Sequence, residues 1–408
     1  MLAGRARENL SDRASGRWRP RAVPANTTGA MHVVVSKKDL VRVLGRCQGV
    51  ADKKSTMPVL GNVLLEVDGP AQLRLAATDL YLAVTGKIPA RVEQGGSVAL
   101  GARDLFERVK MMPEGDIAIS TSGAATTIRA MGASRRFTLH GIPGEEFPAL
   151  PQQEASAAVL SLDVDALAQL ISATHFSIST DETRLHLNSA LFEWDGERVR
   201  MVTTDGHRLS LMETVVSGKS ASSTMLIPLK GVLELKRLCD EAAAESGGDA
   251  AQIKIAQSGP NAFFQLAGYE FSVKLVDSQF PPYHQVIPER SERVVRAPRL
   301  AVSDALRAVS VAASDRTGGV KLTVTKNKLR VESESPESGE GFDELSIDYD
   351  GPDITIGFNA RYFLDVLGAV IDDEVTIGVS GELDPAVIKP ATSSGSSSYV
   401  AVIMPMRI

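Results

Sequence analysis

The sequence predicts an α+β fold made of three copies of one domain, each with two helices packed on an antiparallel sheet. Three observations predict this class. The length of 408 residues suits several domains. Two helical segments recur in the same order along the chain, and segments with alternating apolar residues lie between them. The composition, with 43% hydrophobic and 23% charged residues, is that of an ordinary globular protein.

The first recurring segment is an amphipathic helix, expected at residues 36–44, 163–171 and 303–309. In each copy the apolar residues return every three or four positions, which is the helical period, behind an acidic or serine residue that suits a helix start. The pattern aligns Leu40 with Leu167 and with Leu306. We therefore expect one helix of each domain at these positions.

The second recurring segment is also helical and occupies residues 100–106, 227–233 and 358–364. A basic residue stands at the same place in each copy, as Arg103, Lys230 and Arg361. The order of the two helices is the same in all three copies. Such repetition over the body of the chain indicates duplication of a whole domain, since the copies are longer than any short solenoid repeat.

Strands are expected between the helices, where apolar and polar residues alternate with a period of two. Examples are residues 62–67, 188–194 and 320–324. A Thr-Asp pair closes a later strand in two copies, at Thr78-Asp79 and Thr204-Asp205. The predicted domains are 31–151, 155–290 and 294–408, and connectors rich in proline lie near 143–151 and 281–288.

Residues 1–30 are expected to form a disordered basic extension. They carry six arginines against Glu8 and Asp12 and show no hydrophobic period. Translation that begins at Met31 is the alternative explanation, and a transit peptide fits less well because of the two acids. The formal charge of the whole chain is −6, so the body without this +4 segment carries −10. Binding to nucleic acid would then depend on local basic patches.

The search for catalytic and metal-binding motifs favours a binding protein. The two cysteines, Cys47 and Cys239, exclude a disulfide framework and a Cys-based zinc site, which fits a cytoplasmic location. No phosphate-binding loop, dinucleotide motif, nucleophile elbow or pair of metal-ligating histidines is present, so no cofactor is expected. No apolar run is long enough to predict a membrane span.

The most enzyme-like motif is Thr204-Asp205-Gly206-His207-Arg208-Leu209. Asp205 could orient His207 as a general base, as in a hydrolase or nuclease. The sequence offers no nucleophile or second acid, and the matching segment Thr78-Asp79-Leu80-Tyr81-Leu82 has no histidine. A turn capped by threonine is the structural alternative, and we favour it.

The chain resembles the bacterial DNA polymerase III β subunit, the sliding clamp. The resemblance rests on residues 204–209, on Phe280-Pro281-Pro282-Tyr283, on Met404-Pro405-Met406-Arg407-Ile408, and on the segments 57–62 and 358–360. It implies a head-to-tail homodimer whose six domains form a ring around duplex DNA, with helices inside and sheets outside. It also implies a processivity factor without catalytic activity. A monomeric peptide-binding adaptor that does not bind DNA is a further alternative.

The resemblance implies a site for short peptides of polymerases (including the polymerase III α subunit), of the clamp loader and of repair proteins. The matching residues are Leu185, Leu187, Thr204, Gly206, His207, Arg208, Leu209, Pro281, Val286, Val402, Ile403, Met404, Pro405, Met406 and Arg407. An apolar cleft containing methionine suits varied partners. The alternative for Val402-Ile403-Met404 is an ordinary strand of the core. His186 stands where a gating aromatic residue is expected, so entry to this site would differ.

The resemblance also implies sequence-independent contacts with double-stranded DNA. The matching residues are Lys54, Arg103, Lys110, Arg184 and Lys230, while Lys236, Arg237 and Arg361 are added from their helical positions alone. Each could instead be a solvated surface charge. Asp181-Glu182 precede Arg184 and would repel phosphate, which puts this loop's contact with DNA in doubt.

A dimer interface is expected between the first domain of one protomer and the third domain of its partner. Residues 332–344 hold six acids and neither lysine nor arginine, whereas Arg135-Arg136 begin a strand of the first domain. Opposite charges favour head-to-tail pairing. The predicted interface residues are Phe106, Arg135, Arg136, Val311, Glu337 and Glu340. The alternative for the acidic run is a solvated loop.

Overall fold

The computed structural model describes residues 30–216, 222–246, 251–266, 268–314, 318–336, 338–392 and 395–407. The predicted N-terminal extension, apart from Ala30, and the predicted interface residue Glu337 lie outside these ranges. Within them, one order of elements occurs three times: a strand, a helix, four strands, a second helix and three strands. The predicted α+β class with three repeated units is confirmed.

The first repeat packs two helices against its strands. Its elements are β1 (His32–Ser36), α1 (Lys37–Val50), the 3-10 helix η1 (Pro58–Gly61), β2 (Asn62–Val67), β3 (Gln72–Thr78), β4 (Leu82–Gln94), β5 (Ser97–Gly101), α2 (Ala102–Lys110), β6 (Asp116–Ser122), β7 (Ala125–Ala130) and β8 (Arg136–His140). The short elements β9 (Ile142–Pro143) and η2 (Gly144–Glu146) follow. The buried sides of both helices, with Leu40 and Leu105 fully buried, face the sheet as their apolar periods predict.

The second repeat has the same order. Its elements are β10 (Val159–Asp163), α3 (Val164–Thr174), η3 (His175–Ser177), β11 (Ser189–Trp194), β12 (Arg198–Thr204), β13 (Arg208–Val215), β14 (Ser223–Pro228), α4 (Leu229–Ser246), β15 (Gln252–Ser258), β16 (Asn261–Leu266), β17 (Tyr269–Lys274) and η4 (Tyr283–Gln285). Its core is continuous with that of the first repeat.

The third repeat ends the chain. Its elements are β18 (Arg293–Pro298), α5 (Arg299–Ser310), β19 (Gly319–Thr325), β20 (Lys328–Ser335), β21 (Gly339–Ser346), β22 (Ile354–Asn359), α6 (Ala360–Ala369), β23 (Glu374–Val379), β24 (Ala386–Pro390) and β25 (Ser397–Ile403). Its core is a separate cluster, which Ala173 of α3 joins from the second repeat.

The predicted equivalence of Leu306 with Leu40 and Leu167 is wrong by one helical turn. Each repeat makes the same hydrogen bond at the helix start, from Lys37, Val164 and Arg299 to the carbonyls of Gly115, Ala251 and Asp373 at 2.8–3.0 Å. Three residues after these starts stand Leu40, Leu167 and Val302. A shift of four residues keeps the same face of a helix inward, so the apolar period cannot detect it.

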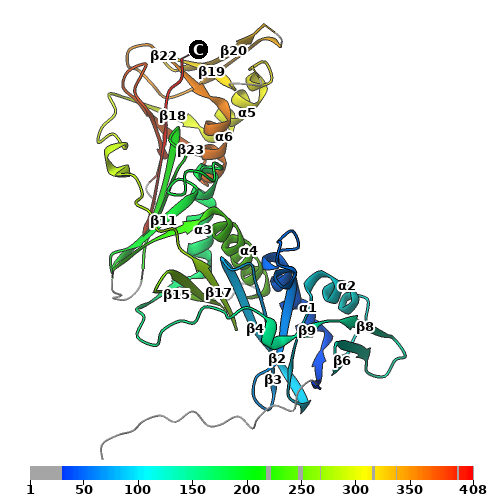
Figure 1. Cartoon of the computed structure of the whole chain (residues 1–408). Helices are drawn as coiled ribbons and strands as arrows, with labels where there is room; N and C mark the ends of the chain where they lie inside the picture. Colours follow the sequence, from blue (N-terminus) through cyan, green and yellow to red (C-terminus); the bar gives the residue numbers. More distant parts are fainter. Residues whose placement is uncertain are drawn as a thin grey trace, which may run out of the picture.

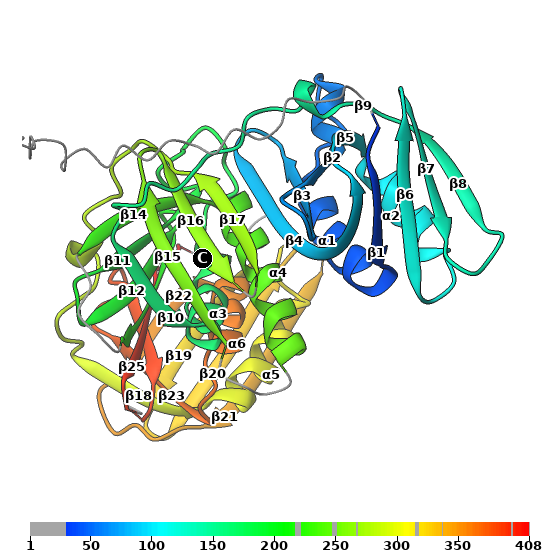
Figure 2. The same cartoon turned by 90° about the horizontal axis from the view of Figure 1, so that it is seen from below.

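Adjacent repeats are joined by strand pairing. The last strand of the second repeat, β17, pairs with β4 of the first, and β25 of the third pairs with β13 of the second. The helices lie along one side of the resulting arc and the sheets along the other (Figure 1). Several strands stand at the ends of the sheets in the described structure, among them β8, the last strand of the first repeat, and β21, the fourth strand of the third. β8 lies at the outer end of the first repeat (Figure 2).

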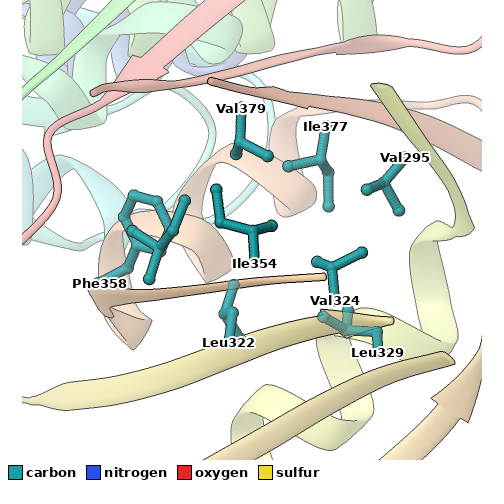
Figure 3. A pocket seen from close by; sticks show the side chains of 9 residues that line it. Val295, Leu322, Val324, Leu329, Ile354, Phe358, Ile377 and Val379 are labelled. Atoms are coloured by element: carbon teal, nitrogen blue, oxygen red, sulfur yellow. The ribbon is translucent and has the colours of Figure 1, made fainter. Parts of the chain in front are cut away.

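The core of the third repeat contains a small apolar cavity. Nine side chains line it, and those labelled in Figure 3 point into the space between β18 and β23 on one side and β19, β20 and β22 on the other. The cavity has a volume of about 20 Å³, which is room for about one water molecule. Because its lining is entirely aliphatic and aromatic, it is a packing defect of the core and has no polar group to hold a ligand.

Candidate DNA-binding and peptide-binding site

The segment 204–209 forms a tight turn between β12 and β13. The hydroxyl of Thr204 donates to the carbonyl of Arg208 (2.7 Å) and accepts from the N–H of Gly206 (3.1 Å). Oδ1 of Asp205 accepts from the backbone N–H groups of His207 and Arg208 at 2.8 and 3.0 Å. Gly206 has a φ of +92°, which only glycine adopts without strain.

The first repeat contains the same turn without the histidine. Thr78 and Asp79 make the corresponding bonds to Leu80, Tyr81 and Leu82, at 2.6–2.9 Å. Leu80 takes the position of Gly206 with a φ of +76°. The hydrogen bonds of the carboxylate are therefore structural, and Asp205 does not orient the His207 ring. That ring stacks instead on Tyr362, with centroids 6.5 Å apart. The hydrolase or nuclease alternative therefore loses the Asp205–His207 pair on which it depended.

Arg208 connects the second and third repeats. Its guanidinium bonds to Asp205 (3.1 Å), to Asp365 on α6 (2.5 Å) and to the carbonyl of Phe176 (2.5 Å). It also lies over the ring of Tyr362, 4.5 Å from the centroid. The side chain is 9% exposed. Arg208 is thus held in place, and it positions the turn on which the predicted peptide site depends.

The predicted peptide-binding residues divide between two faces of the β13–β25 pair. Leu209 and Val402 lie opposite each other and pack with Phe280 and Tyr283 on one face. Arg208 and Ile403 are also opposite each other, but the side chain of Ile403 lies in the core of the third repeat. Ile403 is therefore buried core, as the alternative interpretation held, and the structure does not bring its side chain to the surface beside Leu209.

The other predicted peptide-binding residues belong to segments near Leu209 and Val402. Met404 follows β25 and donates its N–H to the carbonyl of His207 at 2.9 Å, and Met406 donates to Gly357. Leu185, Val286 and Met404 are exposed apolar side chains, at 57%, 43% and 38%. Leu187, Leu209 and Val402 are buried, Thr204, Pro281, Pro405 and Met406 are half-buried, and Gly206, His207 and Arg407 are exposed. His186 is half-buried in the same loop as Leu185.

The predicted DNA-binding residues differ in whether an acid neutralises them. Lys230 at the start of α4 forms an ion pair with Asp79 of the first repeat, and Arg184 pairs with Asp181 at 3.1 Å. Lys236 pairs with Asp240, and Arg237 with Glu234 and Glu241. Among the described residues no such acid partner is found for Lys54, Arg103, Lys110 or Arg361, all of which are exposed. Of the predicted DNA-binding residues, these four are therefore best able to contact phosphate.

The loop at Asp181 holds an ionised carboxylate beside Arg184, and its effect on DNA contact stays a prediction. Asp181 accepts from the backbone and side chain of Thr183 as well as from Arg184, and these bonds lower its pKa, so it stays ionised. The Arg184 guanidinium lies against the 204–209 turn, with Nη1 3.8 Å from where a Cβ of Gly206 would stand. Arg184 is therefore close to the predicted peptide site.

The predicted dimer residues lie at the two ends of the arc. Arg136 is exposed on β8, and Arg135 donates to the carbonyl of Met111. Val311 follows α5 and is 80% exposed. Phe106 on α2 is half-buried against its own repeat. Of the acidic run, Glu332 pairs with Lys321 and Glu344 with Lys328 and Arg330, while the described structure gives Glu334 and Glu340 no basic partner.

Sequence reasoning did not find Phe176, Tyr362 and Asp365, which hold Arg208 and His207. Asp365 is 157 positions from Arg208, so no local pattern could connect them. The sequence does contain one signal for these contacts: the second turn has Arg208 at the position where the first turn has Leu82. A buried arginine needs acidic partners, and Asp365 of the next repeat is one of the two that Arg208 has.

The described residues contain no group of three or more histidine, cysteine, aspartate or glutamate side chains arranged to hold a metal ion. Among the described helices, none is long and apolar enough to cross a membrane.

Comparison with known proteins gives matches along the whole body of the chain. Family models of the DNA polymerase III beta subunit match residues 31–151 (N-terminal domain), 161–282 (central domain) and 284–407 (C-terminal domain). The beta sliding clamp of Escherichia coli K12 is 32% identical over 381 residues, which is 93% of this chain and 100% of the relative. That of Caulobacter vibrioides is 29% identical over 384 residues.

Solved structures give the same result. A Caulobacter crescentus beta sliding clamp superimposes with a TM-score of 0.85 at 29% identity. A Bartonella birtlesii sliding clamp bound to griselimycin gives 0.84 at 32% identity. Each match covers 93% of this chain and 100% of the other.

Proposed function

The chain belongs to the family of bacterial DNA polymerase III β subunits, the sliding clamps, and we propose which of its surfaces close the ring, face DNA and bind partners. The family gives the protein its function: it is the processivity subunit of the polymerase and has no catalytic site of its own. We place its action in the cytoplasm, where the bacterial chromosome is replicated.

One observation carries the assignment of the dimer: both joints within the chain follow one rule. The last strand of a repeat pairs with the fourth strand of the repeat before it, as β17 does with β4 and β25 with β13. Among the described strands, β8 is the last strand and β21 the fourth strand that this rule leaves without such a joint, and each lies at an end of its sheet. Pairing of β21 with β8 of a second copy repeats the joint and leaves neither edge exposed.

The helices support the same pairing. At the first joint Gly49, near the end of α1, lies against Glu234 and Arg237 of α4, about 3 Å from where its Cβ would stand. With the helix starts aligned, Val311 has the position of Gly49, and Glu107 and Lys110 of α2 have those of Glu234 and Arg237. We therefore assign Val311 to a contact with α2 of the partner, beside Phe106 and Lys110.

For DNA we assign the inner, helix-bearing side of the ring, with Lys54, Arg103, Lys110 and Arg361 as the main phosphate contacts. A small number of contacts suits sliding, because phosphate contacts carry no sequence information and many strong ones would hold the ring in place. Lys230 and Arg184 contribute less, since Asp79 and Asp181 already neutralise them.

For partners we assign the surface around Leu185, Leu209, Val286, Val402 and Met404 to short peptides of the polymerase III α subunit, the clamp loader, other polymerases and repair proteins. A buried apolar floor with exposed apolar side chains at its margin is the arrangement that peptide anchors need. Methionine adapts to different anchors.

The deciding test is topological. Fluorescent protein is loaded by a bacterial clamp loader onto nicked circular DNA, isolated, and then followed after cleavage of the circle. A ring stays on the circle and leaves once the DNA is linear, whereas a linear molecule with blocked ends retains it. Retention on linear DNA with free ends would contradict encirclement. Gel filtration combined with crosslinking distinguishes a clamp from a monomeric adaptor, because a dimeric clamp has twice the mass of the 43.5 kDa chain.

A further inference from the structure

A groove lies beside the predicted peptide site and is lined by the segment 275–284. Its volume is about 570 Å³. The strands β11 and β14 form one wall, and the segment that follows β17 forms the other, with Gly259 and Pro260 at one end. Apart from the motif Phe280-Pro281-Pro282-Tyr283, the sequence motifs did not single out the residues that line it. Pro281 lines the groove and also belongs to the predicted peptide site.

The floor of the groove is continuous with that of the peptide site. Leu191, Leu226 and Phe280 line the groove, and they pack in one cluster with Leu209 and Val402 of the peptide site. All five are buried, with at most 9% exposure. A chain that leaves the peptide site across Pro281 would therefore reach a groove whose floor packs against the floor of the peptide site.

The charged groups of the groove are acidic. Glu193 and Asp277 line it, and neither lysine nor arginine does. Glu193 accepts a hydrogen bond from Tyr283 at 3.0 Å and lies 4.0 Å from Arg200, which it shares with Asp195 and Glu213. Burial, and next the Glu193 carboxylate, raises the pKa of Tyr283 to about 12, so the phenol stays protonated and keeps donating. Asp277 is exposed, with no ion pair in the described structure.

We propose that this groove binds the flanking segment of the same partner polypeptide whose short motif occupies the peptide site, through one apolar side chain and one lysine or arginine beside it. The apolar side chain would lie on Leu191 and Leu226, and the cation between Glu193 and Asp277. This inference rests on the proposed peptide site and extends it. Attachment at two points raises affinity by effective concentration and needs no change in the motif itself.

The sheet gives the spacing of the two contacts. β11 and β12 separate β14 from β13, so the groove and the peptide site are roughly 14 Å apart at about 4.8 Å per strand. An extended chain spans this distance with about four to five residues. The basic and apolar pair is therefore expected about five residues from the motif.

The test compares synthetic peptides by calorimetric titration against the full-length protein. One is a Gln-led pentapeptide with apolar ends; the others add a five-residue Gly-Ser spacer and a Leu-Lys pair on the N-terminal or the C-terminal side. One extended peptide is expected to bind about five- to tenfold more tightly than the pentapeptide. If neither binds more tightly, the proposal is overturned.

Two variants locate the gain. Asp277→Lys and the groove-filling Thr224→Phe are expected to abolish the gain from the extension and to leave the affinity for the pentapeptide unchanged. Glu289→Lys is the matched control: it reverses an exposed acid in the same linker outside the groove, and the gain should remain. A gain that survives Asp277→Lys and Thr224→Phe overturns the proposal. Failure of the pentapeptide to bind wild-type protein refutes the peptide site, and the groove proposal falls with it.

Discussion

At the scale of single residues, Arg208 shows how one side chain serves stability and recognition together. It belongs to the motif that resembles the family, yet its guanidinium faces Asp205 and Asp365, away from the floor formed by Leu209. A charge so far removed from water is stabilising only while its acids are present. The shape of the peptide site therefore depends on the ion pair of Arg208 with Asp365, which joins the second and third repeats.

Removal of this ion pair should loosen the joint. Arg208→Ala leaves Asp365 without its cation and should lower the free energy of unfolding by about 2–4 kcal/mol, below the full cost of breaking a buried pair because Asp365 is 30% exposed. Chemical denaturation measures this. In a double-mutant cycle with Asp365→Ala, the coupling should reach about 1–3 kcal/mol. Additive effects would show that the two side chains do not support each other.

Met404 provides the matching test of recognition. It is partly exposed and its backbone is fixed by His207, so Met404→Ala removes apolar surface without breaking the strand. Binding of a clamp-binding pentapeptide should weaken by about 1–3 kcal/mol, as for truncation of an interface anchor. Leu383→Ala, which truncates another exposed apolar side chain of the third repeat, is the control. Calorimetry that finds equal affinities for wild type and Met404→Ala would refute the assignment.

At the scale of elements, the apolar cavity in the third repeat offers a packing test (Figure 3). Val324→Ile adds one methyl group into the space between β23 and β19 and should raise the stability of the protein by about 0.5–1 kcal/mol. Val320→Ile is the control, since Val320 is fully buried on the same strand and does not line the cavity. It should lower stability by about 1–3 kcal/mol through overpacking. Thermal unfolding of both variants decides.

The elements also show what a sequence can reveal. Strand and helix periods depend on neighbours two to four positions apart, so the type and order of elements could be predicted together with the threefold repetition. The equivalence of Leu306 failed because a whole-turn shift preserves a helical face. The partners of Arg208 and Lys230 stand in other repeats, 157 and 151 positions away, and only three-dimensional structure brings them together.

At the scale of the whole molecule, an acidic protein can encircle DNA because its charge is unevenly arranged. In the part of the chain that the structure describes, the helices carry exposed basic side chains without an acid partner, namely Arg103, Lys110 and Arg361, while many other basic side chains are paired with acids. Few contacts then give the affinity for DNA. The closed ring keeps the protein from dissociating, so the contacts do not have to be strong.

Reversal of two inner charges should weaken DNA contact without affecting the fold. Arg103→Glu combined with Arg361→Glu should reduce loading equally on any DNA sequence and should lower the salt dependence of binding. Lys254→Glu, an exposed reversal on strand β15, is the control and should load normally. Lys230 is left unchanged because its reversal would also disturb the pair with Asp79 between repeats. A defect restricted to some DNA sequences would contradict sequence-independent contact.

The ring must also choose a head-to-tail partner over pairing of like ends, and charge gives it a means. Arg135 and Arg136 lie at the β8 edge, whereas Glu334 and Glu340 lie beside the β21 edge without a basic partner in the described structure. Two β8 edges, or two β21 edges, would place like charges together. Exposed ion pairs contribute only about 0–1 kcal/mol each, so strand pairing and the proposed apolar contact of Val311 with Phe106 would have to supply most of the binding energy of the dimer.

Arg135→Glu with Arg136→Glu should therefore shift the protein toward monomer, and high salt should weaken the wild-type dimer only modestly, because the apolar part of the interface is not screened. Lys254→Glu is the control: Lys254 is exposed on β15 of the second repeat, which is paired on both sides, so its reversal changes net charge without altering the β8 edge. Sedimentation equilibrium at two salt concentrations measures all three proteins. A double variant that stays fully dimeric below micromolar concentration would show that these arginines are not at the interface, and the closing joint would then have to differ from the two joints within the chain.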